Sequence, residues 1–337
     1  MATATPQVRG SAYLLFVDFL EKAGAPLDKD LPEALLPAII CKDPEALVPV
    51  HLAHRFIGRA ARSIGLADFG FVVAQDARVD HLGAFGRTVR RSLTLNDALG
   101  KIRSKFPFYS SAETLWWIRN GSSVSFYHAY TCPRMDGRQH AQQGALVLMR
   151  DLVRLVAGPK WQPECVLCPP DIDAAGTRRA FDDARLLPSD HAGFVFPASF
   201  LSLPIAGAHA SRGRDPDTSV FEASAPSDDL AGSIRQIVTT MMAHGAIRLS
   251  DVAMAVGAQP RTLQRRLADA EIDFSEIVAG ARFESALTLL NDPAVRIIDI
   301  AYELGYTDPA NFTRAFRKWT GLSPAQYRRE REEGALS

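Results

Sequence analysis

The chain has 337 residues, a length typical of two domains. Its 38 Lys and Arg residues balance 38 Asp and Glu residues, so bulk charge gives no support for binding nucleic acid. Four cysteines are too few for a disulfide scaffold, no apolar run approaches the ~20 residues of a membrane helix, and no secretory signal is visible, so we expect a cytoplasmic protein without a membrane partner.

The first part of the chain is rich in amphipathic helical patterns. Apolar residues at helical spacing predict helices at Ala12–Ala23, Leu31–Ile40, Val48–Ile64 and Leu95–Lys105. In the third of these, His51 and His54 lie three residues apart, a spacing that suits a metal. Since no carboxylate or cysteine accompanies them at matching spacing, the sequence favours a polar helix edge and predicts no metal site.

Strand patterns follow these helices. Asn120-Gly121 lies between Glu113–Arg119 and Ser122–Tyr130, which alternate at period two, and this predicts a β-hairpin. Downstream we expect a helix at Gln139–Val156, strands at Cys165–Leu167 and Gly193–Phe196, and a helical segment at Arg178–Asp182. Helices mixed with antiparallel strands predict an α+β domain over residues 11–206.

Aromatic side chains gather around the predicted hairpin, and they fit either a ligand pocket or an ordinary core. Trp116 and Trp117 must point to opposite faces of a strand, so at most one of them joins a given pocket wall. The candidate ligand-binding residues are Phe106, Tyr109, Trp116, Tyr127 and His128.

Cys165 and Cys168 form a lone CxxC motif. The prolines at 169 and 170 suggest a strand running into a turn, whereas thioredoxin-like chemistry needs the motif at a helix start. The sequence contains no Gly-rich phosphate loop and no nucleophile elbow. It therefore predicts no catalytic residues, no enzyme and no cofactor, with redox or metal sensing left open as an alternative.

A polar stretch broken by prolines, residues 207–227, predicts a linker, and residues 228–331 then form an all-α domain that begins with a helix at Leu230–His244. Near its end, a short helix with one apolar face stops at Gly305, and Asp308 as N-cap predicts a second helix from Pro309. The outward residues of that second helix are Asn311, Thr313, Arg314, Arg317 and Lys318. This layout is typical of a helix-turn-helix whose second helix enters the DNA major groove.

The helix-turn-helix pattern occurs twice. Aligning Gly257 with Gly305 places Asp251, Val252, Ala253 and Val256 on Asp299, Ile300, Ala301 and Leu304. After the turn the second copy is one residue longer. With that shift, the alignment places Leu263, Arg265 and Leu267 on Phe312, Arg314 and Phe316. A helical hairpin that merely packs would not repeat core, turn and exposed arginine together. Between the copies, Ser275–Asn291 predicts a linker helix of roughly 25 Å, which would hold two recognition helices near one DNA turn apart, about 34 Å.

Residues 250–331 contain eleven Lys and Arg against eleven Asp and Glu, so DNA contacts must depend on local clusters. Arginine suits guanine and asparagine suits adenine in the major groove, although an arginine can equally clamp a phosphate. The predicted DNA-binding residues are Arg261, Gln264, Arg265, Asn311, Thr313, Arg314, Arg317 and Lys318.

The stretch from about residue 229 to 331 resembles the DNA-binding domain of the AraC/XylS family of bacterial transcription regulators. The matching residues are Asp299-Ile300-Ala301, Leu304-Gly305-Tyr306, Phe312-Thr313-Arg314-Ala315-Phe316, Gly321-Leu322-Ser323-Pro324 and Tyr327-Arg328. The resemblance implies two helix-turn-helix motifs joined by a linker helix, acting on double-stranded promoter DNA beside RNA polymerase.

The front domain is similar to the sensor half of the AraC-type subgroup that includes the VirS- and OruR-like regulators. The matching residues are Thr94-Leu95, Ala98-Leu99, Trp161-Gln162-Pro163-Glu164, Val166, Phe194, Phe196-Pro197, Phe200-Leu201 and Leu203-Pro204. This resemblance implies a domain that binds a small-molecule inducer and forms a homodimer, in a regulator that activates transcription. A DNA-repair protein that docks through an AraC-type domain is the competing hypothesis, and it would need a reactive cysteine.

Overall fold

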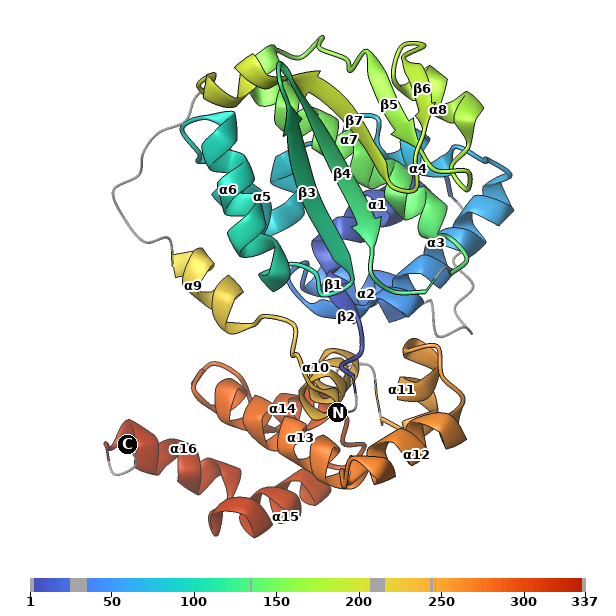
Figure 1. Ribbon diagram of the computed structural model, residues 1–337. Helices are drawn as coiled ribbons and strands as arrows, with labels where there is room; N and C mark the ends of the chain where they lie inside the picture. Colours follow the sequence, from blue (N-terminus) through green and yellow to red (C-terminus); the bar gives the residue numbers. More distant parts are fainter. Residues whose placement is uncertain are drawn as a thin grey trace. The chain divides into compact units, whose positions relative to one another are not determined.

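The computed structural model describes residues 3–24, 35–133, 135–206, 216–242, 245 and 247–334, and the chain divides into two compact units (Figure 1). The N-terminal unit is Pro6–Pro226, and the C-terminal unit joins Met1–Thr5 to Ser227–Ser337. Among the described helices, none combines the length and the apolar character needed to cross a membrane.

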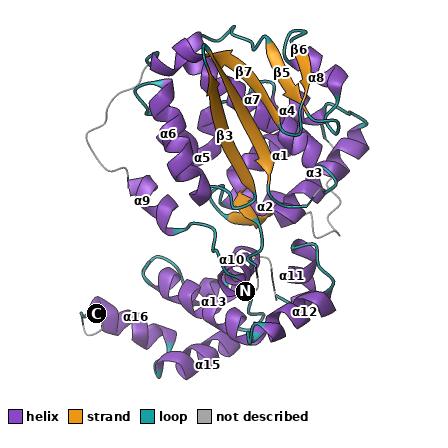
Figure 2. Cartoon of the chain, viewed as in Figure 1, coloured by secondary structure: helices purple, strands orange, loops and turns teal. Residues whose placement is uncertain are grey.

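The N-terminal unit is an α+β fold built on a five-stranded sheet (Figure 2). The strand order is β3-β4-β7-β5-β6, and every neighbouring pair is antiparallel except β5 with β6. The strands are β3 (Glu113–Asn120), β4 (Ser123–Tyr130), β5 (Cys165–Cys168), β6 (Arg185–Pro188) and β7 (Ala192–Pro197), and a separate antiparallel pair is β1 (Gln7–Arg9) with β2 (Leu47–Pro49).

Helices pack against one face of the larger sheet, with α7 against β4 and β7 and with α6 beside β3 (Figure 1). The α-helices of this unit are α1 (Leu14–Lys22), α2 (Leu35–Lys42), α3 (Val50–Ile64), α4 (Phe69–Ala74), α5 (Gly83–Arg90), α6 (Leu95–Lys105), α7 (Arg138–Ala157), α8 (Ala174–Ala180) and α9 (Pro216–Ala223). Short 3-10 helices are η1 (Gly10–Tyr13), η3 (Val79–Leu82), η4 (Phe106–Phe108) and η5 (Ala198–Ser202). Helices α4 and α7 approach closely at Gly70, where a Cβ would lie 1.9 Å from the carbonyl oxygen of His140.

The hairpin of β3 and β4 carries the alternation that the sequence predicts. Gly121 takes φ 59° at the turn, and the register pairs Glu113 with Tyr130 and Trp116 with Tyr127. Because side chains alternate between faces, these two pairs lie on opposite sides of the sheet. The face that carries Glu113 is the one buried under the helices.

Several elements differ from the sequence predictions. The structure contains α4, α5, β1, β2 and β6, which the periodicity did not single out, and the predicted helix at Leu31–Ile40 is described only from Leu35, as α2. The predicted helical segment Arg178–Asp182 is wrong in its bounds, because α8 ends at Ala180. Asp182 and Asp183 instead take φ 48° and 59°, a left-handed turn that short polar side chains tolerate.

The helix α9 lies within residues 207–227, whose composition indicates a linker. The buried guanidinium of Arg9 binds it to the N-terminal unit: Nη2 donates to the carbonyl oxygens of Phe221 at 2.9 Å and Ser224 at 2.8 Å. The same guanidinium donates to the carbonyls of Glu45 and Phe108, and it lies 4.9 Å from the centre of the Phe221 ring. This helix therefore packs as part of the N-terminal unit.

Helices make up the regular secondary structure in the described part of the C-terminal unit, apart from one isolated β-bridge between Thr3 and Asp229. Its helices are α10 (Leu230–Met242), α11 (Leu249–Ala255), α12 (Pro260–Asp269), α13 (Phe274–Leu290), α14 (Ile297–Glu303), α15 (Pro309–Thr320) and α16 (Pro324–Glu332). The last two residues of the predicted helix Leu230–His244 lie outside the described residues.

Candidate nucleic-acid interface and effector cavity

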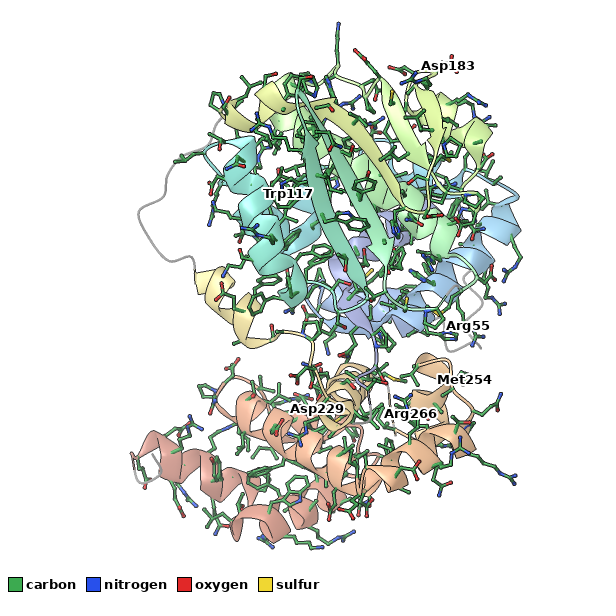
Figure 3. All side chains as sticks on the ribbon, in the orientation of Figure 1. Arg55, Trp117, Asp183, Asp229, Met254 and Arg266 are labelled. Carbon is green, nitrogen blue, oxygen red and sulfur yellow. The ribbon has the colours of Figure 1, made fainter. Side chains whose placement is uncertain are left out.

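The first helix-turn-helix consists of α11 and α12 (Figure 3 labels Met254 and Arg266 on them). Pro260 opens α12, where a missing N–H costs nothing, and Leu263 and Leu267 are buried beneath it. Of the predicted DNA contacts, Arg261, Gln264 and Arg265 are all exposed on this helix. The neighbouring Arg266 donates from Nη2 to the carbonyl oxygen of Thr3 at 2.8 Å, so it is held within the unit.

The second helix-turn-helix consists of α14 and α15. Asp308 caps α15, accepting from the N–H of Ala310 at 2.9 Å, and Phe312 and Phe316 are fully buried below the helix. Four of the predicted contacts are exposed on α15: Asn311, Arg314, Arg317 and Lys318. Thr313 differs, because it is half-buried and its hydroxyl donates to the carbonyl oxygen of Pro309 at 3.1 Å.

The two motifs share their turn geometry. Gly257 and Gly305 both take φ 73°, and the residue after each glycine donates its N–H to a carbonyl five residues back, at 2.8 Å in the first motif and 3.0 Å in the second. At Gly305 a second constraint applies, since a Cβ there would lie 2.7 Å from the carbonyl oxygen of Gly245. The repeat predicted from the sequence is therefore a repeat of backbone conformation as well as of residue type.

Two of the predicted base contacts are bound to each other. The guanidinium of Arg314 donates from Nη2 to Oδ1 of Asn311, one turn earlier on the exposed side of α15. A guanidinium has five N–H donors, so Arg314 can keep this bond and still donate to an acceptor in front of the helix. The contact holds both side chains on the outer surface of α15.

The helix α13 connects the motifs and is fixed to the second one. Arg282 donates from Nε to the carbonyl oxygen of Leu304 at 3.1 Å, and its guanidinium lies 4.6 Å from the centre of the Tyr306 ring. The Phe283 ring contacts Phe316 and Trp319. With 17 residues, α13 spans about 25 Å at ~1.5 Å per residue.

The N-terminal unit contains a cavity of about 80 Å³ under the buried face of the sheet. A single water needs roughly 10–15 Å³, so this space is larger than a packing defect. Its wall includes residues of α1, α5, α6, α7, β3 and β4, among them Leu15, Phe16, Phe85, Val89, Ile102, Leu115, Phe126, Leu148, Met149 and Leu152. The lining is therefore mainly aliphatic and aromatic.

Polar side chains also line the cavity. Nε2 of His128 lies 2.9 Å from Oε2 of Glu113, and Oε1 of Glu113 accepts from the hydroxyl of Ser110 at 3.0 Å. His128 is 1 % exposed, and its Nδ1 has no hydrogen-bond partner among the described residues. Burial raises the pKa of Tyr13 and of Tyr130 well above the ordinary value, so both hydroxyls stay protonated.

The structure separates the five predicted ligand-binding residues. Phe106, Tyr109 and His128 line the cavity. Trp116 and Tyr127 stack on each other on the opposite face of the sheet, with ring centres 5.1 Å apart. Sequence reasoning missed Tyr13 and Glu113; Glu113 shares a sheet face with His128, and period-two alternation could have indicated this.

The cysteines of the CxxC motif lie at the two ends of β5. Cys165 accepts a hydrogen bond from Nη2 of Arg185 at 3.2 Å, and burial raises the pKa of the Cys168 thiol, which disfavours the reactive thiolate. Among the described residues, no three His, Cys, Asp or Glu side chains come together as metal ligands.

Each of the two units contains a region that matches a known protein-family model. Residues 252–330 match a family model described as a helix-turn-helix domain, and residues 24–205 match one described as the arabinose-binding domain of AraC transcription regulator, N-terminal part. A transcriptional regulator described as uncharacterized, Rv1395 of Mycobacterium tuberculosis, is 36% identical over 80 residues, which are 24% of this chain and 23% of that protein's length.

The transcriptional regulator VirS of Mycobacterium tuberculosis is 25% identical over 280 residues, covering 81% of this chain and 82% of that protein. The crystal structure of the transcriptional regulator CdpR from Pseudomonas aeruginosa covers 95% of this chain and 98% of its own, with 18% identity and a TM-score of 0.42. The model of the N-terminal domain alone matches more than half of the chain. This protein therefore belongs to the AraC family of transcriptional regulators.

Proposed function

We propose that this regulator is a cytoplasmic homodimer that activates transcription from double-stranded promoter DNA in response to a small molecule, in contact with RNA polymerase. The observation that carries the DNA-binding part is the repeated geometry of the two motifs. Each presents an exposed arginine, Arg265 or Arg314, above a buried core residue and after a glycine turn with φ 73°. Two such helices joined by α13 suit two successive segments of the major groove.

The exposed residues divide into two proposed roles. We assign base readout to Arg265 and Arg314 through guanine O6 and N7, and to Gln264 and Asn311 through adenine. Arg261, Arg317 and Lys318 are then phosphate contacts, which position the protein without specifying sequence. We give Thr313 a minor part, because its hydroxyl already donates within α15.

Arg265→Ala and Arg314→Ala in the full-length chain test this assignment. Each loss of a bidentate contact should weaken binding to a selected duplex by about 1–3 kcal/mol, or roughly 5- to 150-fold, and affect random duplex far less. Fluorescence anisotropy over a range of salt concentrations separates the roles, since a phosphate contact changes the salt slope by about one and weakens all sequences alike. A suitable control is Arg235→Ala: this exposed arginine lies on α10, outside both motifs, and pairs with Glu284.

We propose that the inducer occupies the cavity of the N-terminal unit and acts through α9. Phe85 lines the cavity, and its ring centre lies 6.4 Å from that of Phe221 on α9. Helix α9 ends at Ala223, and the C-terminal unit begins at Ser227. A ligand that moves Phe85 would therefore shift the segment that leads into the DNA-binding unit.

Homodimerisation is open to direct measurement. Analytical ultracentrifugation of the full-length chain, with and without promoter DNA, should give twice the monomer mass for the free protein. A monomer at all concentrations would remove the dimer from this proposal and leave the DNA contacts untouched.

A further inference from the structure

We infer that Asn311 is a positioning residue, which holds the guanidinium of Arg314 for a guanine of the second half-site, whereas Arg265 reads the first half-site without such a partner. This inference rests on the proposed function of α12 and α15 as recognition helices. It deepens that function, because the two halves of the operator would then differ in how strictly they are read.

The hydrogen bond that carries this inference joins two exposed side chains on successive turns of α15. Oδ1 of Asn311 accepts from Nη2 of Arg314, three residues further on, and residues at this spacing are neighbours on a helix surface. An exposed arginine side chain has many rotamers, and binding to a base costs the entropy of fixing them. A bond that already limits those rotamers lowers the cost of binding.

The bond leaves Arg314 able to read a guanine. A guanidinium has two edges that each present a pair of N–H groups, one formed by Nε and Nη2 and the other by Nη1 and Nη2. Because Nη2 carries two hydrogens and Asn311 accepts one of them, one edge stays complete. That edge suits O6 and N7 of guanine. The second lone pair of Oδ1 and the amide hydrogens of Asn311 remain for the adenine contact proposed above.

The charges on α15 favour the same orientation of Arg314. Arg317 and Lys318 are exposed three and four residues after it, towards the C-terminus of the helix. Like charges at this spacing repel, so they disfavour rotamers that carry the guanidinium towards them. Side chains of a helix also lean towards its N-terminus, which is the direction of Asn311.

The equivalent arginine of the first motif has different neighbours. Arg265 and Arg314 are each the sixth residue of their helix, and the third residue is Thr262 in α12 where α15 has Asn311. Among the described residues, Arg265 makes no hydrogen bond or ion pair. Asp269 follows Arg265 by four residues, where α15 has a lysine. The first motif therefore presents its arginine without the restraint found in the second.

Two double-mutant cycles on the full-length chain provide the test. One combines Asn311→Ala with Arg314→Ala, and the control cycle combines Thr262→Ala with Arg265→Ala at the equivalent positions. Each variant is titrated by fluorescence anisotropy with a duplex that the unmodified protein selects, and with the same duplex after one guanine is replaced by adenine. The replaced guanine is the one whose selection is abolished by the arginine substitution of that cycle. The ratio of the two dissociation constants measures the preference for guanine.

We expect Asn311→Ala to lower the preference for guanine about two- to ten-fold, the effect of one hydrogen bond, although the base itself is assigned to Arg314. In the background of Arg314→Ala the same substitution should leave that ratio unchanged. In the first motif, Thr262→Ala should change the ratio by less than about two-fold in either background.

A conservative variant separates positioning from other roles of the amide. Asn311→Asp keeps an oxygen that accepts from Arg314, so it should preserve the preference for guanine, while its negative charge weakens binding to all duplexes alike. These side chains are exposed, so the thermal unfolding midpoints of the variants should match that of the unmodified protein.

The outcomes distinguish this inference from the proposed function. Tighter binding by Asn311→Ala would overturn the inference, because the bond would then withhold Arg314 from DNA. A preference for guanine that disappears in Arg314→Ala but is unchanged in Asn311→Ala would also overturn it and keep recognition by α15. Equal losses in Asn311→Asp and Asn311→Ala would show that Asn311 does not act through the guanidinium. If Arg314→Ala alters no base preference, recognition by α15 and this inference both fail.

Discussion

Replacing Arg9 with methionine should release α9 from the N-terminal unit. Arg9 is 2 % exposed, and its guanidinium donates to the carbonyl oxygens of Glu45, Phe108, Phe221 and Ser224 at 2.7–3.2 Å. Each hydrogen bond from a charged donor contributes about 1.5–3 kcal/mol, and each carbonyl left buried and unpaired costs about 1–3 kcal/mol. Because these terms overlap and some carbonyls will find water, we expect a total loss near 3–5 kcal/mol.

Thermal unfolding and hydrogen exchange measure the two consequences of this change. At roughly 2–4 °C per kcal/mol for a domain of this size, the midpoint of the N-terminal unit should fall by about 6–20 °C. The amides of α9 should lose protection even under conditions where the sheet stays folded. The control is Arg103→Met, because Arg103 is exposed on α6. A midpoint for Arg9→Met that matches this control, with α9 still protected, would refute the reasoning.

Three further predictions concern stability. Gly305→Ala should lower the free energy of unfolding in urea by about 1–3 kcal/mol, because φ is 73° and the new Cβ would lie 2.7 Å from the carbonyl oxygen of Gly245. Its control, Gly280→Ala, has open space around the new Cβ and should be neutral or stabilising in the same measurement. Asp308→Ala removes the cap of α15 and should cost about 1 kcal/mol by the same measurement. Burial lowers the pKa of His54 to about 3 in the folded chain. Between about pH 6.5 and pH 3 this imidazole is therefore protonated mainly in the unfolded chain. Stability should therefore fall as pH drops from about 6.5 towards 3, by up to about 1.4 kcal/mol per unit, and His54→Leu should flatten that slope; an equally steep slope in the variant would contradict it.

The C-terminal unit was predictable in detail because its signals are local. A glycine at each turn, an aspartate before Pro309 and apolar residues at helical spacing act within a few residues of one another. They correctly placed the turn conformations, the cap of α15 and the buried residues Phe312 and Phe316. The hydrogen bond between Asn311 and Arg314 was not predicted, because the spacing of apolar residues does not report the rotamers of exposed side chains.

The N-terminal unit depended on contacts between distant residues. Its cavity brings Tyr13, Glu113 and Met149 together from a 3-10 helix, a strand and a helix whose packing no local pattern specifies. Alternation alone would have shown that Tyr127 and His128 cannot share one wall. The docking of α9 was hidden for a similar reason, because its main partner is an arginine more than 200 residues earlier in the chain.

The central claim is that two equivalent helices of one chain read adjacent segments of DNA, and selection of bound duplexes from a random library by the full-length protein tests it most directly. We predict a bipartite motif with half-sites about 10–10.5 base pairs apart. Arg265→Ala should lose sequence preference in one half and Arg314→Ala in the other. A motif with a single half-site would contradict the account, and so would a loss of sequence preference in the same half-site for both variants.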